Sequence, residues 1–387
     1  MLLKHSSGRT AGRVTPCAPA DFELHRPAQT DNPAESRFAQ RRFTKRLCRM
    51  KRSWLALLLA LAAGREPVTA AQARELRLGY FPNLTHAQAL YARATGAFDK
   101  LGVQIRWTAF NAGPTAIESL FTDAVDATFI GPSPTINGYM KSKGGKFVVV
   151  AGAACGGSGL VVRKDSGIAN ERDFAGKVIA TPQLGNTQDV AARVWFARMG
   201  YRLRERGGTV SLVPLSNADQ LTMFKKKQID GAWTVEPWLA RLEVEGGGAL
   251  FLDEKNLWPG GRYVTTHLVV NRAYLADNAE VLRSLIAALI EITAVINSNK
   301  TAVIPVLNDQ IRQETGKPLR DEVIRKAMTR VEFTWDPVCA SLEKSAEAAH
   351  AVGLLRNPPA LRGIYSLRLL NGVLREKNLA PVEEPPL

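Results

Sequence analysis

Small polar side chains recur at the turns where strands of the chain are expected to give way to helices. The first turn covers residues 81–86 (FPNLTH). Asn83 and Thr85 can each cap the following helix or donate a hydrogen bond to a ligand, and the sequence favours neither role over the other. Neutral His86 can donate to an anion, whereas a lone histidine near a loop is often only a satisfied surface group. Together these residues favour the binding of an anion at a helix start.

The same arrangement follows later strands. Residues 111–115 (NAGPT) and 131–134 (GPSP) place proline where a first helical turn tolerates it, and their glycines let a ligand approach the backbone. Residues 181–189 (TPQLGNTQD) contain an Asn and an Asp three positions apart, which is typical of a capped helix start. Asn186 then caps the helix, which leaves Gln183 and Thr187 free to face a ligand.

Residues 233–238 (WTVEPW) form a further turn, in which Glu236 is the acidic side chain. A carboxylate repels a bound anion unless the ligand carries its own positive charge, as the ammonium group of taurine does. A carboxylate also stabilises the first turn of a helix. The sequence leaves both interpretations of Glu236 open.

The chain lacks the motifs of catalytic and nucleotide-binding sites. The sequences GxGxxG, GxxxxGK[ST], GxSxG and HExxH are all absent. After residue 73 the histidines are His86, His267 and His350, which are far apart in sequence. These absences predict a binding protein without cofactor or metal rather than an enzyme.

The formal charge of +15 comes largely from the N-terminal part of the chain. Residues 1–73 hold 13 Lys/Arg and 5 Asp/Glu, so they carry +8 and the remainder carries +7. The remainder contains no sustained basic stripe with interleaved aromatic residues. We therefore interpret its charge as a solvated surface rather than as a nucleic-acid partner site.

Residues 50–73 have the pattern of a cleavable signal peptide: a charged start (MKR), an apolar run at residues 53–64, and a small-residue cleavage pattern (AQA). The apolar run is shorter than the roughly 20 residues of a spanning helix. We expect export to the periplasm and a mature start at Arg74. Residues 1–49 are either an over-extended gene start or a disordered leader.

Four cysteines occur, and Cys17 and Cys48 precede the mature start. Cys155 and Cys339 remain, and a pair so far apart in sequence makes neither a zinc motif nor a disulfide framework. An oxidising compartment permits a bridge between them, but we favour two free, buried thiols.

The elements that must position these turns alternate between strands and helices, which is typical of parallel sheets covered by helices. After about Asn278 the chain is predicted to be almost wholly helical. Glycines near residues 153–159 and 259–261 suggest two crossings between lobes, that is, a hinge, although ordinary turns explain them equally well. The expected strands are Leu76–Tyr80, Val103–Phe110, Ala127–Ile130, Phe147–Ala151, Gly159–Arg163, Val178–Thr181, Val210–Leu215, Gly231–Thr234 and Val264–Val270.

A weak internal repeat supports two lobes of similar construction. The order helix, loop, strand and proline appears at residues 117–134 and again at residues 219–238. Asp126 and Asp230 open the strands, and an aromatic residue follows each aspartate by three positions. Any α/β protein can repeat this order, so common ancestry of the lobes and coincidence both remain open.

The chain resembles the periplasmic substrate-binding proteins of nitrate/sulfonate/taurine ABC importers. The resemblance covers roughly Leu76 to Lys377. It implies a two-lobe α/β fold of the type II binding-protein class, with a hinge and a helical C-terminal region. The first lobe would comprise residues 74–155 and 263–387, and the second lobe residues 156–262. The motifs that carry the resemblance are LRLGYFPNLTHAQAL, FNAGPTAIESL, FIGPSPTINGY, ATPQLGNTQDV, IDGAWTVEPW and LWPGGRYVTTHLVV.

The resemblance also implies a ligand and a partner. The ligand would be a small organic anion, sulfonate-like or possibly nitrate, and the protein would deliver it as a monomer to an inner-membrane permease. A thiamine-pyrimidine synthase-like enzyme, a pyrimidine-precursor binding protein and a periplasmic sensor subunit are the alternatives. Carried onto this chain, the resemblance favours Trp233 as packing for the organic tail. The oxyanion contacts that it favours are Asn83, Thr85, Gly113, Ser133, Ser158, Gln183, Asn186, Thr187 and Thr266.

Overall fold

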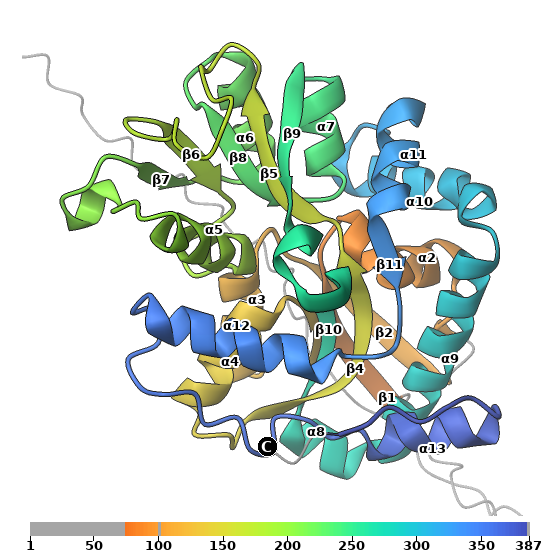
Figure 1. Ribbon diagram of the computed structural model, residues 1–387. Coiled ribbons are helices and arrows are strands. Elements are labelled where there is room, and N and C mark those ends of the chain that lie inside the picture. Colours follow the sequence, from red (N-terminus) through yellow and green to blue (C-terminus); the bar gives the residue numbers. More distant parts are fainter. Residues whose placement is uncertain (1–73, 100–101, 385–387) are drawn as a thin grey trace, which may run out of the picture. The chain divides into compact units, whose positions relative to one another are not determined.

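The computed structural model describes residues 74–99 and 102–384 (Figure 1). The predicted leader (1–49) and signal peptide (50–73) lie outside the described residues. In the described part of the chain, no helix is both long enough and apolar enough to cross a membrane. The strands of this part form two sheets, one of six strands and one of five.

The six-stranded sheet has the order β11-β4-β10-β3-β1-β2. β1 pairs in parallel with β2 and β3, whereas β10 is antiparallel to β3 and β4. We call this sheet and the helices that pack on it the first lobe. Its strands are β1 (Arg74–Tyr80), β2 (Val103–Ala109), β3 (Ala127–Ile130), β4 (Phe147–Gly156), β10 (Val264–Asn271) and β11 (Val331–Phe333).

The five-stranded sheet has the order β7-β6-β8-β5-β9. β6 pairs in parallel with β7 and β8, and β5 is antiparallel to β8 and β9. We call this sheet, with α5, α6 and α7, the second lobe. Its strands are β5 (Ser158–Arg163), β6 (Val178–Thr181), β7 (Ser211–Pro214), β8 (Gly231–Val235) and β9 (Gly248–Asp253).

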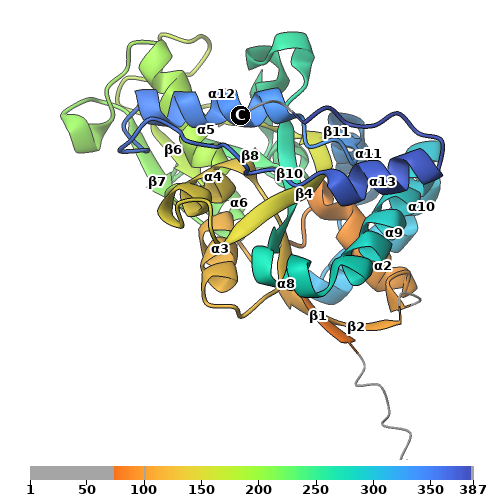
Figure 2. The same cartoon turned by 90° about the horizontal axis from the view of Figure 1, so that it is seen from below.

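Helices follow most strands, as the alternating pattern predicts. The C-terminal part of the chain is mostly helical, and α13 packs beside α9 (Figure 2). The helices are α2 (Ala87–Thr95), α3 (Gly113–Phe121), α4 (Pro132–Lys141), α5 (Thr187–Arg198), α6 (Asn217–Lys225), α7 (Trp238–Val244), α8 (Arg272–Asp277), α9 (Ala279–Ser298), α10 (Lys300–Thr315), α11 (Asp321–Arg330), α12 (Cys339–Ala351) and α13 (Arg368–Glu376). Short 3-10 helices are η1 (Leu84–His86), η3 (Arg204–Arg206), η4 (Glu254–Leu257) and η5 (Pro259–Gly261).

The chain passes between the two sheets at two glycine-containing connections. Gly157 joins β4 to β5, and both it and Gly156 adopt positive φ angles of 70° and 71°. The return runs through η4 and η5 to β10, with Gly260 and Gly261 at φ 65° and 70°. These backbone conformations favour glycine, which explains the composition of both connections.

Each lobe has its own buried core. β4 and β10 of the first lobe are buried along nearly their whole length, and the apolar face of α9 packs in the same core. In the second lobe, Phe174 packs edge-on against Trp195 and Phe196. Cys155 and Cys339 are free and buried, which confirms the preference for unpaired thiols.

The two halves of the internal repeat share a backbone contact, whereas the arginine paired with the aspartate comes from the parallel neighbour β1 in the first lobe and from the antiparallel neighbour β5 in the second. In the first lobe the Asp126 carboxylate accepts a hydrogen bond from the Arg77 N–H (2.8 Å) and pairs with the Arg77 guanidinium (2.5 Å). In the second lobe the Asp230 carboxylate accepts from the Val178 N–H (2.9 Å) and pairs with Arg163 (3.1 Å). Each aspartate thus ties the start of one strand to its parallel neighbour. The repeat in the sequence therefore corresponds to a repeated structural unit.

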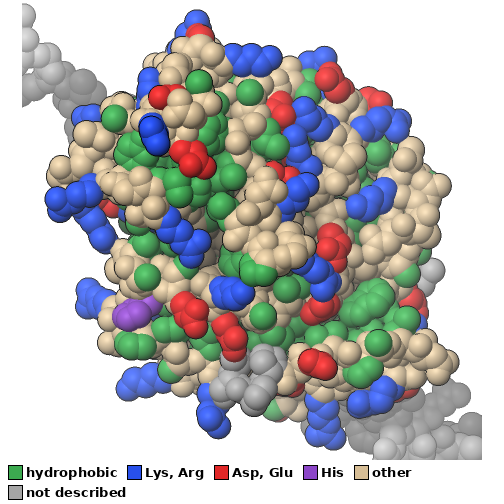
Figure 3. All heavy atoms as spheres, in the orientation of Figure 1, with side chains coloured by type: hydrophobic (Ala, Val, Ile, Leu, Met, Phe, Trp, Pro, Cys, Tyr) green, Lys and Arg blue, Asp and Glu red, His purple; other side chains and the backbone are tan. Residues whose placement is uncertain are grey.

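Basic side chains do not gather into a continuous stripe on the face shown in Figure 3. Lys and Arg side chains there are scattered and lie among acidic ones. This distribution agrees with a solvated surface on that face.

Candidate functional site

Strand-to-helix turns of the two lobes meet at a small cavity of about 20 Å³, which we call the interlobe cavity. A volume of this size holds about one water molecule, so the two lobes are nearly closed on each other. Its lining residues are Phe81, Asn83, Thr85, His86, Asn111, Gly113, Gly131, Pro134 and Thr265 from the first lobe, and Pro182, Asn186, Thr187, Gln188, Asn217 and Val235 from the second.

Half of the predicted ligand contacts gather in this cavity: Asn83, Thr85, His86, Gly113, Asn186 and Thr187. They come from turns that are far apart in sequence. The carboxyl ends of parallel strands share one edge of a sheet, so turns that follow those strands converge.

His86 presents a single donor to the cavity. The Phe81 N–H donates to His86 Nδ1 (3.3 Å), and the two rings stack at 4.5 Å. Because Nδ1 accepts, the proton of the neutral ring resides on Nε2. Burial lowers the pKa of His86 to about 3, so the ring is neutral near pH 7. His86 is therefore a fixed, uncharged N–H donor.

Two asparagines have their acceptor atoms occupied by the protein. Trp238 Nε1 donates to Asn83 Oδ1 (3.0 Å), a hydrogen bond that joins the two lobes. Thr234 Oγ1 donates to Asn217 Oδ1 (2.8 Å). The amide NH₂ groups of both asparagines therefore remain as the hydrogen-bonding groups for a ligand.

At the start of α5, protein donors likewise occupy the side-chain oxygens of Asn186 and Thr187. The Ser133 N–H of the first lobe donates to Thr187 Oγ1 (3.4 Å), and the Gln188 N–H donates to Asn186 Oδ1 (3.4 Å). The Thr187 O–H and the Asn186 NH₂ group stay available as donors. Gly131 lies against Thr187, because a Cβ built on this glycine would be 2.5 Å from Thr187 Oγ1.

Five side chains of the lining therefore present donors while an acceptor atom of each is already hydrogen-bonded by the protein. Within the described residues, no protein acceptor is hydrogen-bonded to the side-chain donors of Asn83, His86, Asn186, Thr187 and Asn217. None of the lining side chains carries a charge at neutral pH. Helices α3, α4, α5 and α6 also begin at this cavity, so their positive dipole ends point toward it. The arrangement suits an oxyanion.

Removal of the His86 donor should weaken anion binding. We expect His86→Phe to lower anion affinity by about tenfold to hundredfold, because a hydrogen bond to a charged group contributes roughly 1.5–3 kcal/mol. Because the ring stays neutral well above its pKa of about 3, wild-type affinity should not change between pH 5 and pH 8 through His86. Calorimetric titration across that range checks both points. A gain in affinity below pH 6.5 that His86→Phe abolishes would contradict the neutral donor.

Ser158 and Trp233 do not line the interlobe cavity. Both donate to Glu254 Oε2, at 2.6 Å from Ser158 Oγ and 2.8 Å from Trp233 Nε1. Trp233 is completely buried inside the second lobe, so it cannot pack against a ligand tail as expected. Glu254 itself is buried, and burial raises its pKa while these hydrogen bonds oppose the rise.

Glu236 is not a ligand contact either. Its side chain is fully buried, Oε1 accepts from Arg330 (2.9 Å) and Oε2 accepts from the Ala240 N–H (3.1 Å). Arg330 also pairs with Glu243 (2.6 Å), so it joins α11 of the first lobe to α7 of the second. Burial raises the pKa of Glu236 to about 7, against the opposing effect of Arg330. The helix-stabilising interpretation is thus the better of the two.

The remaining predicted contacts lie near the cavity but do not line it. Thr265, not Thr266, faces it; the Thr266 hydroxyl is buried with no hydrogen-bond partner in the described part of the chain. Gln183 lies half-buried in the loop before α5. Ser133 lines a neighbouring groove. Asn217 is not among the predicted contacts, although it follows β7 as the small polar residue that marks a helix start.

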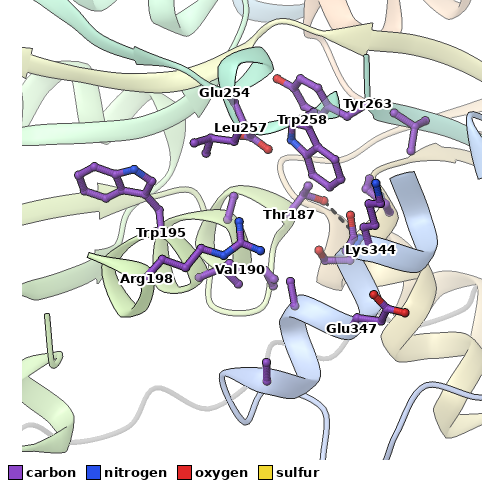
Figure 4. Close-up of a pocket in the computed structure, with 18 of the residues that line it drawn as sticks. Thr187, Val190, Trp195, Arg198, Glu254, Leu257, Trp258, Tyr263, Lys344 and Glu347 are labelled. Atoms are coloured by element: carbon purple, nitrogen blue, oxygen red, sulfur yellow. Dashed lines mark hydrogen bonds between the residues drawn. The ribbon is translucent and has the colours of Figure 1, made fainter. Parts of the chain in front are cut away.

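Two larger cavities flank the interlobe cavity. One, of about 450 Å³, shares Thr187 with it and is shown in Figure 4. The other, of about 410 Å³, shares Asn83, Asn111 and Asn217 with it. We call the first the aromatic groove, because Trp195, Trp258 and Tyr263 are among its walls.

The described residues offer no group of three or more His, Cys, Asp or Glu side chains placed to hold a metal ion. Neither Cys155 nor Cys339 lines the interlobe cavity, and burial raises the pKa of both thiols. A reactive thiolate is therefore not presented there.

Comparison with known proteins gives relatives that bind sulfonates and nitrate. A putative aliphatic sulfonates-binding protein of Bacillus subtilis (strain 168) is 27% identical over 186 residues, 47% of this chain and 53% of the relative. The match thus spans about half of that relative. It agrees with the resemblance that the sequence motifs predicted.

Solved structures share the fold. The alkanesulfonate-binding protein SsuA from Xanthomonas axonopodis pv. citri, bound to MOPS, has a TM-score of 0.63 at 20% identity, covering 75% of this chain and 97% of that one. The periplasmic nitrate-binding protein NrtA from Synechocystis PCC 6803 has a TM-score of 0.66 at 14% identity, covering 79% and 89%. The predicted two-lobe α/β binding-protein fold is confirmed. A profile of the NMT1-like family matches residues 69–306, more than half of the chain, and the chain therefore belongs to the NMT1-like family.

Proposed function

We propose that this protein is a substrate-binding protein that captures a small organic anion between its lobes. The observation that carries the proposal is the interlobe cavity, in which neutral donors and four helix starts converge and no side chain is charged at neutral pH. The sulfonate- and nitrate-binding relatives support an aliphatic sulfonate, a taurine-like compound or nitrate as the ligand. The protein would deliver the ligand, as a monomer, to the permease of an ABC importer.

The proposal includes export and a hinge. Residues 50–73 would direct the chain to the periplasm and be removed before Arg74. The cavity of about 20 Å³ is too small for a nitrate ion or a sulfonate head, so the lobes would have to separate to admit and hold the anion. They would open and close at the two glycine-containing connections, near Gly157 and near Gly260 and Gly261. The positive φ angles at these glycines support this placement, since glycine adapts to a change of backbone dihedral at low cost.

Calorimetric titration of the mature protein tests the proposal. Alkanesulfonates, taurine, sulfate, nitrate and a pyrimidine phosphate are titrated in turn, and each is incubated with the protein to detect turnover. We expect tight, non-catalytic binding of an organic sulfonate or nitrate. Turnover of any compound, or preference for the pyrimidine phosphate, would support the enzyme-like alternative instead.

A matched pair of variants locates the binding. Thr187→Ala should lower anion affinity about tenfold to hundredfold, because it removes a hydroxyl donor that lines the cavity. Gln183→Ala, four residues earlier and outside the lining, should leave affinity unchanged. Equal effects of the two substitutions would argue against binding in the interlobe cavity.

A further inference from the structure

Asn83 begins η1 but does not cap it. An asparagine at a helix start usually accepts a hydrogen bond from the backbone of the first turn through its side-chain oxygen. Asn83 forms no such side-chain cap, although its backbone is held by hydrogen bonds to Phe81 (2.8 Å) and His86 (2.9 Å). The Asn83 side chain is buried and lines the interlobe cavity. Capping therefore does not account for the orientation of this amide.

Trp238 of the second lobe occupies the Asn83 oxygen instead. Its Nε1 donates to Asn83 Oδ1 at 3.0 Å. An indole N–H can only donate, so the amide oxygen must face Trp238 and the NH₂ group must point elsewhere. Asn83 lines both the interlobe cavity and the cavity of about 410 Å³ beside it, whereas Trp238 lines only the second of these two. The partner of the oxygen thus lies outside the interlobe cavity, and the NH₂ group is left for a ligand inside it.

Asn217, whose amide also has a side-chain partner, is fixed less strictly. Thr234 Oγ1 donates to Asn217 Oδ1 at 2.8 Å. A hydroxyl can accept as well as donate, so a rotated Asn217 amide can donate to Thr234 and turn its oxygen to the cavity. The donor-only indole excludes this alternative at Asn83.

The Trp238 indole is itself held in place. The Arg241 guanidinium lies over the ring at 4.5 Å from its centre, which is a cation–π contact. Arg241 in turn donates two hydrogen bonds of 3.0 Å to the Glu245 carboxylate. Trp238 and Arg241 belong to α7, and Glu245 follows its last residue. A ring fixed in this way gives its N–H a defined direction.

The hydrogen bond between Asn83 and Trp238 joins the lobes beside one of the glycine-containing connections. A Cβ built on Gly157 would lie 3.6 Å from Thr85 Cγ2 and 3.7 Å from Glu236 Cγ. Asn83 precedes Thr85 by two positions, and Trp238 follows Glu236 by two. A hinge rotation displaces the atoms near its axis least. The bond should therefore persist when the lobes separate enough to hold an anion.

We infer that Trp238 is a positioning residue for anion binding, because from the second lobe it fixes the Asn83 amide of the first so that only N–H donors face the ligand. The inference rests on the proposed function and concerns specificity. An amide that cannot rotate favours a ligand that offers only acceptors, as a sulfonate or nitrate does. A ligand that offers a donor at the same place meets the Asn83 NH₂ group, and both donors stay unpaired.

A double-mutant cycle between Trp238 and Asn83 tests the inference by calorimetric titration with methanesulfonate. Trp238→Phe keeps an aromatic ring for Arg241 and removes the N–H. It should lower affinity about threefold to tenfold, the effect of one hydrogen bond, but should lower it no further in an Asn83→Ala background. Trp238→Leu replaces it in the cycle if Trp238→Phe does not fold. Additive losses of affinity would overturn the inference.

Methanesulfonamide, in which an NH₂ group replaces one sulfonate oxygen, gives a second measurement. The preference for methanesulfonate over methanesulfonamide should be smaller in Trp238→Phe than in wild type, because the freed Asn83 amide can turn its oxygen toward the sulfonamide. An equal loss of affinity for both ligands would show that Trp238 acts only by packing, and would overturn the inference.

Trp335→Phe is the matched control, because Trp335 lines neither the interlobe cavity nor the two cavities that flank it. It should leave both affinities unchanged. A wild-type protein that binds no anion would overturn the proposed function and this inference with it. An additive cycle in a protein that binds methanesulfonate would overturn this inference alone.

Discussion

Gly131→Ala is expected to lower anion affinity about fivefold to hundredfold, while the loss of the glycine N-cap of α4 lowers the stability of the first lobe by only about 1 kcal/mol. Gly131 precedes α4 in the first lobe, and a Cβ at this position would lie 2.5 Å from Thr187 Oγ1 of the second lobe. Its φ of −74° is accessible to alanine, so the open protein experiences no backbone strain. The added methyl group acts only when the lobes close, and overpacking of this kind costs roughly 1–3 kcal/mol.

Calorimetric titration gives the affinity, and urea unfolding gives the free energy of unfolding. Gly372→Ala in α13 is the control, because a Cβ there meets no atom within 4 Å. It should leave anion affinity unchanged. Wild-type affinity in Gly131→Ala would show that the lobes need not approach each other at Gly131 when the ligand binds.

Arg330→Met is expected to destabilise the protein by about 3–5 kcal/mol at pH 9. The substitution removes the partner of the buried Glu236 carboxylate and of the partly buried Glu243 carboxylate, and loss of one member of a buried ion pair leaves an uncompensated charge. Glu236 has no other cationic partner in the described part of the chain, whereas Glu243 keeps Lys326 at 3.0 Å. Most of the loss should therefore come from Glu236. Urea unfolding at pH 5, 7 and 9 measures it.

The loss should depend on pH through Glu236. Burial raises the pKa of this carboxyl from 4.5 to about 7, so its protonated form is the one that the folded state favours. Its contribution to stability is full below pH 4.5 and is lost as pH rises through about 7. Removal of Arg330 raises the pKa further. Arg330→Met should consequently differ little from wild type at pH 5 and most at pH 9.

Glu236→Gln is the matched control for this pH dependence. It cannot ionise, and it leaves Arg330 paired with Glu243 at 2.6 Å. Its stability should fall less than that of wild type between pH 5 and pH 8. An Arg330→Met variant that is equally destabilised at pH 5 and pH 9 would show that Glu236 is ionised throughout.

Short-range sequence patterns were enough to predict the turns that line the cavity. Asn186 before α5, and the glycine and prolines in the first turns of α3 and α4, mark helix starts by short-range chemistry alone. A parallel sheet then brings such turns to one edge. Asn83 and His86 of the first lobe meet Thr187 of the second because these edges of the two sheets both border the interlobe cavity.

The roles of the other predicted site residues depend on partners that are distant in sequence, and no local pattern identifies those partners. Glu236 pairs with Arg330, 94 positions later, and this partner decides that the carboxylate is structural. Ser158 and Trp233 face Glu254, which lies in an irregular connection without a motif. Thr265 rather than Thr266 faces the cavity. Register shifts on both sides of Thr266 in the pairing of β10 with β4 interrupt the regular alternation of side chains, so the sequence alone does not indicate which threonine faces the cavity.

The most direct measurement is a crystal structure of the mature protein with hexanesulfonate. The account predicts that the sulfonate oxygens lie in the interlobe cavity within hydrogen-bonding distance of His86 Nε2 and the Thr187 hydroxyl. A sulfonate bound anywhere outside this cavity, or no bound sulfonate at saturating concentration, would contradict it.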